Sequence, residues 1–142
     1  MTRARLEELL SHRDPMLLLD ELTDEGDTYA ESIVRITPKT AFFEQGRGVP
    51  SWIGIEYMAQ TIGIVAGSQS RSDGGGAAMG YLLGTRRYRC SPAWFTDGQI
   101  LKVRCDEQLT DNNGLGVYSC SIRDGETLAN ARLTVFRKPP DE

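Results

Sequence analysis

One carboxyl group stands alone in an otherwise uncharged stretch of the sequence. Glu56 is the only charged residue between positions 48 and 70, and Gln60 follows it by four residues. Side chains four residues apart are neighbours on a helix, so the Gln60 amide can hydrogen-bond the carboxyl group and fix its rotamer. Apolar surroundings raise the pKa of a carboxyl group, because they disfavour its charged form. Glu56 is therefore predicted to act as a general acid, for example toward a hydroxyl that departs as water.

The helix that would carry Glu56 offers two further features for binding. At about 100° per residue, the face of Glu56 also includes Trp52, Ala59, Gln60, Gly63 and Gly67. The two glycines leave room on that face for another backbone or an extended ligand. Pro50 and Ser51 mark the predicted helix start, with Ser51 as the N-cap. Unpaired N–H groups at such a start can polarise a carbonyl oxygen.

Apolar side chains occur on every side of this helix. They are Trp52, Ile53, Ile55, Met58, Ile62, Ile64 and Val65. A helix that is apolar all round belongs inside a protein or a membrane. A membrane span requires about 20 mainly apolar residues, and Glu56, Gln60 and several glycines interrupt this run, so we expect a buried central helix and no membrane span. A buried Glu56 also has an alternative role without chemistry, in which it hydrogen-bonds the backbone of a neighbouring strand or subunit.

The remaining sequence has the alternating pattern of strands. The predicted strands cover residues 16–22, 29–36, 79–89, 100–109, 115–122 and 127–136. Asn113-Gly114 and Asp124-Gly125 predict tight hairpins, because these residues accept the positive φ of a type I′ turn. Five or six antiparallel strands and one apolar helix predict an α+β hotdog fold, in which the sheet wraps around the central helix. The 142 residues fit one domain, and dimerisation would cover an unpaired edge strand.

Composition argues against several classes of function. The chain has 16 basic and 20 acidic residues in mixed order and a formal net charge of −4, which argues against a nucleic-acid surface. Three cysteines without a CxxC pair and a single histidine do not match a zinc site, so no metal is predicted. The N-terminal residues lack the apolar stretch of a signal peptide, which favours a cytoplasmic protein.

Three segments resemble one protein family in order and spacing. Residues 10–20, LSHRDPMLLLD, resemble the PHRxPxLLxD opening of bacterial 3-hydroxyacyl-acyl-carrier-protein dehydratases, and residues 49–60, VPSWIGIEYMAQ, resemble their MPGxLxxEAMAQ helix. Residues 80–88, GYLLGTRRY, are similar to the dehydratase-like subgroup found with aryl-polyene biosynthesis. The resemblance extends over most of the chain. It implies a hotdog protein that dehydrates a 3-hydroxyacyl thioester in fatty-acid or aryl-polyene type biosynthesis.

The family mechanism gives several of these residues a role. In that mechanism a histidine removes the proton α to the thioester and the helix acid protonates the departing 3-hydroxyl, which leaves a trans-2-enoyl thioester at a site between two subunits. By position, the acid carries over to Glu56 and its partner to Gln60. The carbonyl donors carry over to main-chain N–H groups near Val49, Ser51 and Trp52. The resemblance implies no separate cofactor, because an acyl carrier protein delivers the substrate on its phosphopantetheine.

The chain departs from the family at the catalytic histidine. The family's GHFPG segment corresponds to residues 41–48, AFFEQGRG, which contain no histidine. The only histidine, His12, matches a position outside the catalytic pair, so we interpret it first as a packed, hydrogen-bonded residue and second as a replacement base. We therefore expect a half-site, in which this chain lends Glu56 and a histidine-bearing hotdog partner completes a heterodimer, with a homodimer as the alternative. Two other hypotheses are a non-catalytic hotdog subunit that binds a carrier protein or a partner, and a hotdog acyl thioesterase.

A local cluster of basic residues is a candidate docking surface for the carrier protein. Arg86, Arg87 and Arg89 lie on one predicted strand, where Arg87 and Arg89 face alike. Carrier proteins are acidic and the pantetheine carries a phosphate, so charge complementarity would steer docking. The alternative is an ordinary solvated strand edge. Gly63 and Tyr81 are candidates for the acyl-binding surface, although an aromatic residue is more often part of a core or an interface.

Overall fold

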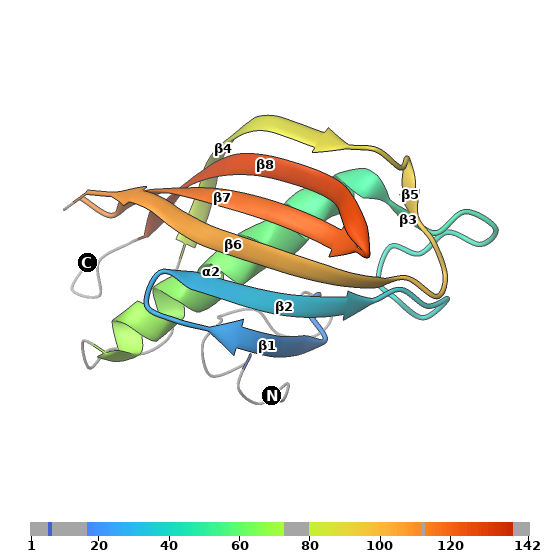
Figure 1. Ribbon diagram of the computed structural model, residues 1–142, viewed down its shortest axis with the longest axis horizontal. Coiled ribbons are helices and arrows are strands. Elements are labelled where there is room, and N and C mark those ends of the chain that lie inside the picture. The colour runs from blue at the N-terminus through green and yellow to red at the C-terminus, as the bar shows by residue number, and fades with distance from the viewer. Residues whose placement is uncertain (1–5, 7–16, 73–79, 112, 138–142) are drawn as a thin grey trace.

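The computed structural model describes residue 6 and residues 17–72, 80–111 and 113–137. Most of these residues form antiparallel strands around one long helix (Figure 1). The elements are β1 (Glu21–Glu25), β2 (Tyr29–Arg35), β3 (Val49–Pro50), the 3-10 helix η1 (Ser51–Ile53), α2 (Gly54–Ser72), β4 (Gly80–Cys90), β5 (Trp94–Phe95), β6 (Ile100–Thr110), β7 (Leu115–Asp124) and β8 (Glu126–Arg137).

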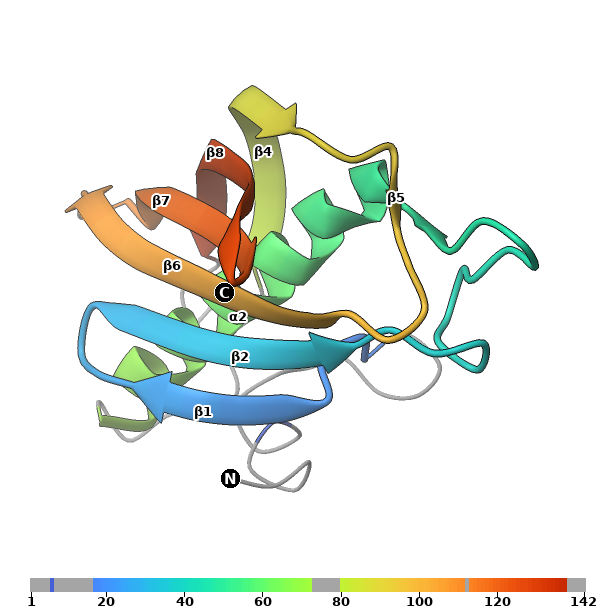
Figure 2. The same ribbon diagram turned by 45° about the vertical axis from the view of Figure 1, so that its right-hand side comes forward.

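Six of the strands form a single sheet that curls around α2. Their order is β1-β2-β6-β7-β8-β4, and all neighbours run antiparallel. The helix α2 crosses the concave face of this sheet, while β3 and β5 pair separately near the helix start (Figures 1 and 2). The strands β1 and β4 are the two edges. This arrangement confirms the predicted hotdog fold.

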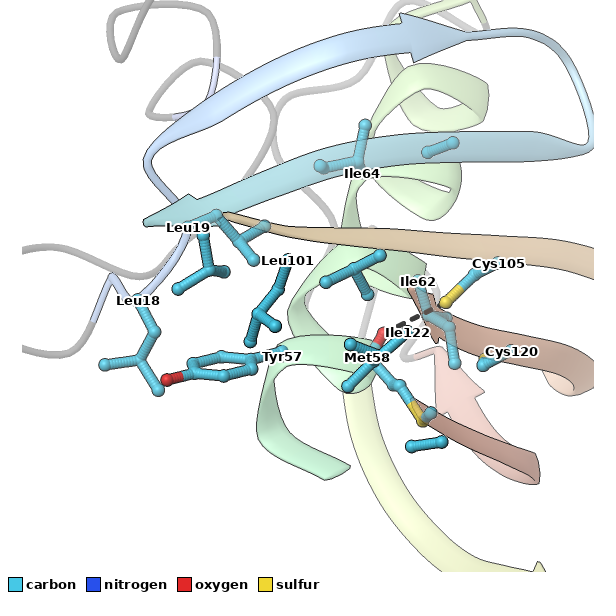
Figure 3. Close-up of a cluster of buried hydrophobic side chains, with 14 of the residues drawn as sticks. Leu18, Leu19, Tyr57, Met58, Ile62, Ile64, Leu101, Cys105, Cys120 and Ile122 are labelled. Atoms are coloured by element: carbon cyan, nitrogen blue, oxygen red, sulfur yellow. Dashed lines mark hydrogen bonds between the residues drawn. The ribbon is translucent and has the colours of Figure 1, made fainter. Parts of the chain in front are cut away.

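The core lies between α2 and the inner face of the sheet (Figure 3). Along β2, β6 and β7 buried residues alternate with more exposed ones, as the period-two pattern predicts. The largest fully buried side chains include Tyr57, Met58, Ile62 and Ile64 from α2 and Leu101 from β6. Among the described residues only Ser32, Gln60 and Thr61 are buried and polar. The hydroxyl groups of Ser32 and Thr61 bond each other at 2.7 Å, which leaves Gln60 as the buried polar side chain to be explained.

The first strand begins later than the sequence predicts. Residues 17–20 form no regular element, and β1 begins only at Glu21 instead of at position 16. The Leu18 N–H donates to the side chain of Gln60 at 2.9 Å, so the backbone contacts the helix at this residue. Two residues later, the Asp20 N–H already bonds the Ile33 carbonyl oxygen of β2 at 2.9 Å. The apolar residues here are nevertheless buried. A short apolar run predicts burial but does not distinguish a strand from an irregular buried segment.

Both predicted hairpins are present, but the turn at Asp124-Gly125 is not of the predicted type I′. That type requires a positive φ at both central residues, and among the described non-glycine residues only Phe42 and Arg87 have one. Gly114 lies between β6 and β7 at φ 95°, and Gly125 lies between β7 and β8 at φ 79°. Both values fall in the left-handed region that glycine adopts without steric cost. Within the described ranges, no helix has both the length and the apolar character that crossing a membrane requires.

Candidate active site

The predicted contact between Glu56 and Gln60 is present in the structure. The Gln60 Nε2 donates to the Glu56 Oε1 at 3.2 Å, one turn apart on α2. On its other side, the Gln60 Oε1 accepts the Leu18 N–H at 2.9 Å. An N–H group can only donate, so the bond from Leu18 fixes the amide oxygen on that side and directs the NH₂ group toward Glu56. A short hydrogen-bonded chain therefore links the backbone at Leu18 to the carboxyl group.

The two side chains of this pair differ in their exposure. Gln60 is completely buried, whereas Glu56 is half-buried at the same end of α2. Glu56 is therefore less deeply enclosed than the core residues around it on α2. Its rotamer is held from the protein side, and part of the residue remains accessible to a ligand or to a partner.

The start of α2 is held by the short strand pair β3–β5. The N–H of Ser51, which follows β3 directly, donates to the Ala93 carbonyl oxygen at 3.0 Å. The 3-10 turn η1 then leads into α2; its N-cap is Pro50, and no side chain caps it. The predicted N-cap role of Ser51 is therefore wrong. The 3-10 turn begins one residue earlier than a capped α-helix would, which places Ser51 inside the helical segment.

Of the main-chain N–H groups predicted to bind the substrate carbonyl near residues 49–52, one remains available. The Ser51 N–H is already donated to Ala93, and Val49 is buried in the β3–β5 ladder. Within the described part of the chain, the Trp52 N–H has no acceptor outside its own helix, and the first N–H groups of a helix find none within it. Trp52 is also 65% exposed. Trp52 is therefore the remaining donor candidate, one helical turn before Glu56.

Tyr88 is a contact residue at this site that the sequence patterns do not indicate. Its hydroxyl donates to the Ser51 carbonyl oxygen at 2.6 Å, from β4 to the helix start. Its neighbour is Gly54, the first residue of α2, where a Cβ atom would overlap the Tyr88 hydroxyl. A glycine inside an apolar helix costs about 1 kcal/mol relative to alanine, so it calls for a packing reason. Gly54 thus indicates that some group approaches the helix here, but the sequence does not show that this group is Tyr88.

We expect Gly54→Ala to lower the free energy of unfolding by about 1–3 kcal/mol, although alanine has the higher helix propensity. The added Cβ would overlap the Tyr88 hydroxyl and lie 2.9 Å from Cδ1 of Ile122, so both neighbours must move. Urea denaturation followed by circular dichroism measures the change. The matched control is Gly84→Ala, because nothing lies within 4 Å of a Cβ at that position. Equal stability of the two variants would contradict the proposed close packing at Gly54.

The structure places the other predicted site residues as follows. Gly63 is half-buried on α2, and Arg87 is exposed on β4 at φ 57°. Tyr81 and Arg86 pair with Phe136 and Arg132 through the backbone of β4 and β8, but their side chains lie outside what the structure describes. His12 also lies outside the described residues, so its two interpretations stay predictions.

The segment that corresponds to the family's histidine motif forms a compact loop. The Phe43 N–H donates to the Thr40 carbonyl oxygen at 3.0 Å, and Phe42 has a φ of 69° with 50% of its surface exposed. The Glu44 carboxylate lies 4.0 Å from the Arg47 guanidinium. No histidine occurs anywhere in residues 17–137. The described residues near the start of α2 therefore include a carboxyl group with a hydrogen-bonded partner and an exposed main-chain donor, without an imidazole.

The enclosed helix and its oriented carboxyl group define this chain as a hotdog protein with an acid on the central helix. Its fold is similar to that of a hypothetical thioesterase with coenzyme A from Streptococcus pneumoniae, with a TM-score of 0.66 and 13% identity over 83% of this chain and 84% of that chain. The chain belongs to the ApeP-like family, whose model is described as ApeP dehydratase and matches residues 4–142.

Two further relatives agree with this family. The 3-hydroxyacyl-acyl-carrier-protein dehydratase FabZ of Brucella ovis is 26% identical over 140 residues, which cover 94% of this chain and 87% of the relative. A chain in the structure of the dehydratase heterocomplex ApeI:P from Xenorhabdus doucetiae is 29% identical, with a TM-score of 0.87 over 96% of this chain and 93% of that chain. The predicted relationship to the hotdog dehydratases of the FabZ and ApeP type is confirmed.

Proposed function

We propose that this chain is the acid-bearing subunit of a heterodimeric 3-hydroxyacyl-thioester dehydratase. The observation that carries the proposal is the hydrogen-bonded chain from Leu18 through Gln60 to Glu56. A half-buried carboxyl group with a fixed rotamer is suited to deliver a proton to one point of a bound ligand. Because residues 17–137 contain no histidine, the base is assigned to a second hotdog subunit.

The reaction divides between the two subunits. The partner's imidazole takes the proton from C2 of the 3-hydroxyacyl chain, while the thioester carbonyl oxygen takes up negative charge and accepts the Trp52 N–H. The C2 electron pair forms the C2–C3 double bond as the C3–O bond breaks. Glu56 gives its proton to the departing hydroxyl, which leaves as water, and the product is the trans-2-enoyl thioester. Transfer of the proton from the imidazolium to the Glu56 carboxylate, directly or through water, restores both groups.

The edge strand β4 is the proposed site of pairing with the partner. It has eleven residues and borders only β8, whereas the opposite edge strand, β1, has five residues. An unpaired edge presents a row of backbone N–H and C=O groups, and pairing with a second sheet would satisfy them. The likeness to a chain from the ApeI:P heterocomplex supports a heterodimer rather than a homodimer.

The substrate is proposed to arrive on an acyl carrier protein. Arg87 and Arg89 are exposed on β4, close in sequence to Tyr88, which contacts the helix start. Positive charge beside the site would attract the acidic carrier protein and the phosphate of its pantetheine arm. Similarity to FabZ and to the ApeP family supports acyl chains of the fatty-acid or aryl-polyene type.

A non-catalytic subunit is the second candidate, and the absence of a histidine from residues 17–137 favours it. In that case the chain would stabilise its partner without supplying Glu56 to any reaction. The third hypothesis, a thioesterase, has only the likeness of fold at 13% identity behind it.

The experiment that separates these functions combines the purified chain with a 3-hydroxyacyl carrier protein and a histidine-bearing hotdog subunit from the same organism. Absorbance of the conjugated enoyl thioester reports dehydration, and release of free thiol reports thioester hydrolysis. We expect slow dehydration by either subunit alone and a rise of about 10²-fold or more on mixing, because each side then gains the proton-transfer group it lacks. A partner that reaches the full rate alone would contradict the shared site.

A further inference from the structure

The peptide unit between Ser51 and Trp52 is hydrogen-bonded at its carbonyl oxygen by two donors. The Ser51 carbonyl oxygen accepts the Tyr88 hydroxyl at 2.6 Å and also the Gly54 N–H of the 3-10 turn, which it shares with the Trp52 carbonyl oxygen. A carbonyl oxygen has two lone pairs, so both are in use. On the other side of the residue, the Ser51 N–H donates to Ala93 at 3.0 Å.

The bonds to this carbonyl act directly on the Trp52 N–H. The Ser51 C=O and the Trp52 N–H belong to one planar peptide unit, so fixing the carbonyl fixes the direction of the N–H. Hydrogen bonds in a chain also polarise one another, so that each bond strengthens the next. A carbonyl that accepts two hydrogen bonds therefore makes the N–H of the same peptide a better donor.

Three local features bring the Tyr88 hydroxyl to this carbonyl. The pairing of β4 with β8 shifts register between Arg86 and Arg89, and Arg87 adopts a φ of 57°, so a bulge turns Tyr88 toward the helix. Gly54 leaves out the side chain that would overlap the hydroxyl. Burial, and then the neighbouring Cys90, raise the pKa of Tyr88 above its ordinary value, so the hydroxyl keeps its proton and acts as a donor throughout the physiological range.

We propose that Tyr88 is a positioning residue that orients and strengthens the Trp52 N–H as a donor to the thioester carbonyl oxygen of the substrate. This inference rests on the proposed dehydratase function, which supplies the carbonyl. Removal of the C2 proton moves negative charge onto that oxygen, and a donor fixed in advance stabilises this charge more than it stabilises the uncharged substrate. Trp52 lies four residues before Glu56 in the same helical segment, and the proposal places C1 of the acyl chain at the Trp52 N–H and C3 at the Glu56 carboxyl group.

The test is Tyr88→Phe, which removes the hydroxyl and keeps the ring. Loss of a complete oxyanion donor lowers kcat by about 10²–10³-fold, and we expect a smaller loss of about tenfold here, because the donor remains but is less well fixed. KM should change little, since the lost stabilisation belongs to the transition state. The assay uses the reconstituted complex of both subunits. The matched control is Tyr29→Phe on β2, which removes a hydroxyl that bonds Asp24 at 3.1 Å. The kcat of the Tyr29→Phe complex should stay unchanged.

Amide hydrogen exchange of the segment from Ser51 to Gly54 provides a readout that does not depend on turnover. We expect faster exchange in this segment for Tyr88→Phe and not for Tyr29→Phe. A Tyr88→Phe complex with normal kcat, or with a raised KM alone, would overturn the positioning role while the dehydratase function stands. If the unsubstituted complex fails to dehydrate the substrate, the proposed function itself is wrong. Unchanged exchange in Tyr88→Phe would by itself refute the proposal that the Tyr88 hydroxyl holds the Ser51–Trp52 peptide.

Discussion

Replacing Glu56 with glutamine is expected to lower the kcat of the reconstituted dehydratase by about 10²–10⁴-fold, the usual contribution of a positioned general acid. Glutamine occupies nearly the same volume and can still bond Gln60, so the helix and its packing stay as they are. What is lost is the acidic proton, because an amide does not release one to the departing hydroxyl. Enoyl absorbance with a 3-hydroxyacyl carrier protein measures the change in rate.

A second glutamate serves as the control for this substitution. Glu31 is also half-buried, but it points away from the helix on β2 and lies 3.9 Å from Lys102. Glu31→Gln should therefore leave kcat unchanged. Gel filtration of both variants with the partner subunit establishes that the complexes still assemble. If the Glu56→Gln complex turns over at the normal rate, Glu56 has no part in the chemistry and the non-catalytic function gains support.

The fold could be predicted from the sequence because its two main patterns are regular and local. Apolar residues on every side of one helix require that the helix be enclosed, and the strands with period two provide the enclosing sheet. The start of β1 was predicted wrongly for the opposite reason. The run at residues 17–19 is apolar and buried, but its backbone bonds a glutamine side chain on the helix. The spacing of apolar residues in the sequence does not predict a contact of that kind.

The site could be predicted only as far as its contacts are local. Gln60 reaches Glu56 across one turn, and the spacing of four residues shows this directly. The bond from Leu18 to Gln60 spans 42 positions, and the bond from Tyr88 to Ser51 spans 37. Both depend on how the sheet curls around the helix, so the sequence offered no spacing rule for them. The prediction of Ser51 as a main-chain donor failed because its N–H pairs with Ala93, the residue before the two-residue strand β5.

Gln60→Met is expected to weaken both folding and catalysis. Methionine matches glutamine in length but provides neither an acceptor for the Leu18 N–H nor a donor for Glu56. A buried N–H without a partner costs about 1–3 kcal/mol in the free energy of unfolding. The Glu56 carboxyl group would also lose the bond that fixes its rotamer, and imprecise placement of a proton donor lowers kcat by about tenfold to a hundredfold. Urea denaturation and the enoyl assay measure the two effects.

The neighbouring residue Thr61 separates these two consequences. Its hydroxyl is also fully buried and bonds Ser32 at 2.7 Å and the Tyr57 carbonyl oxygen at 2.9 Å, away from Glu56. Thr61→Val should therefore destabilise the fold by a comparable amount, about 1–3 kcal/mol, with little change in kcat below the unfolding transition. If both variants lose activity in proportion to stability, Gln60 acts only through the core. A selective loss of kcat in Gln60→Met means that the backbone at Leu18, through this amide, sets where the proton is delivered.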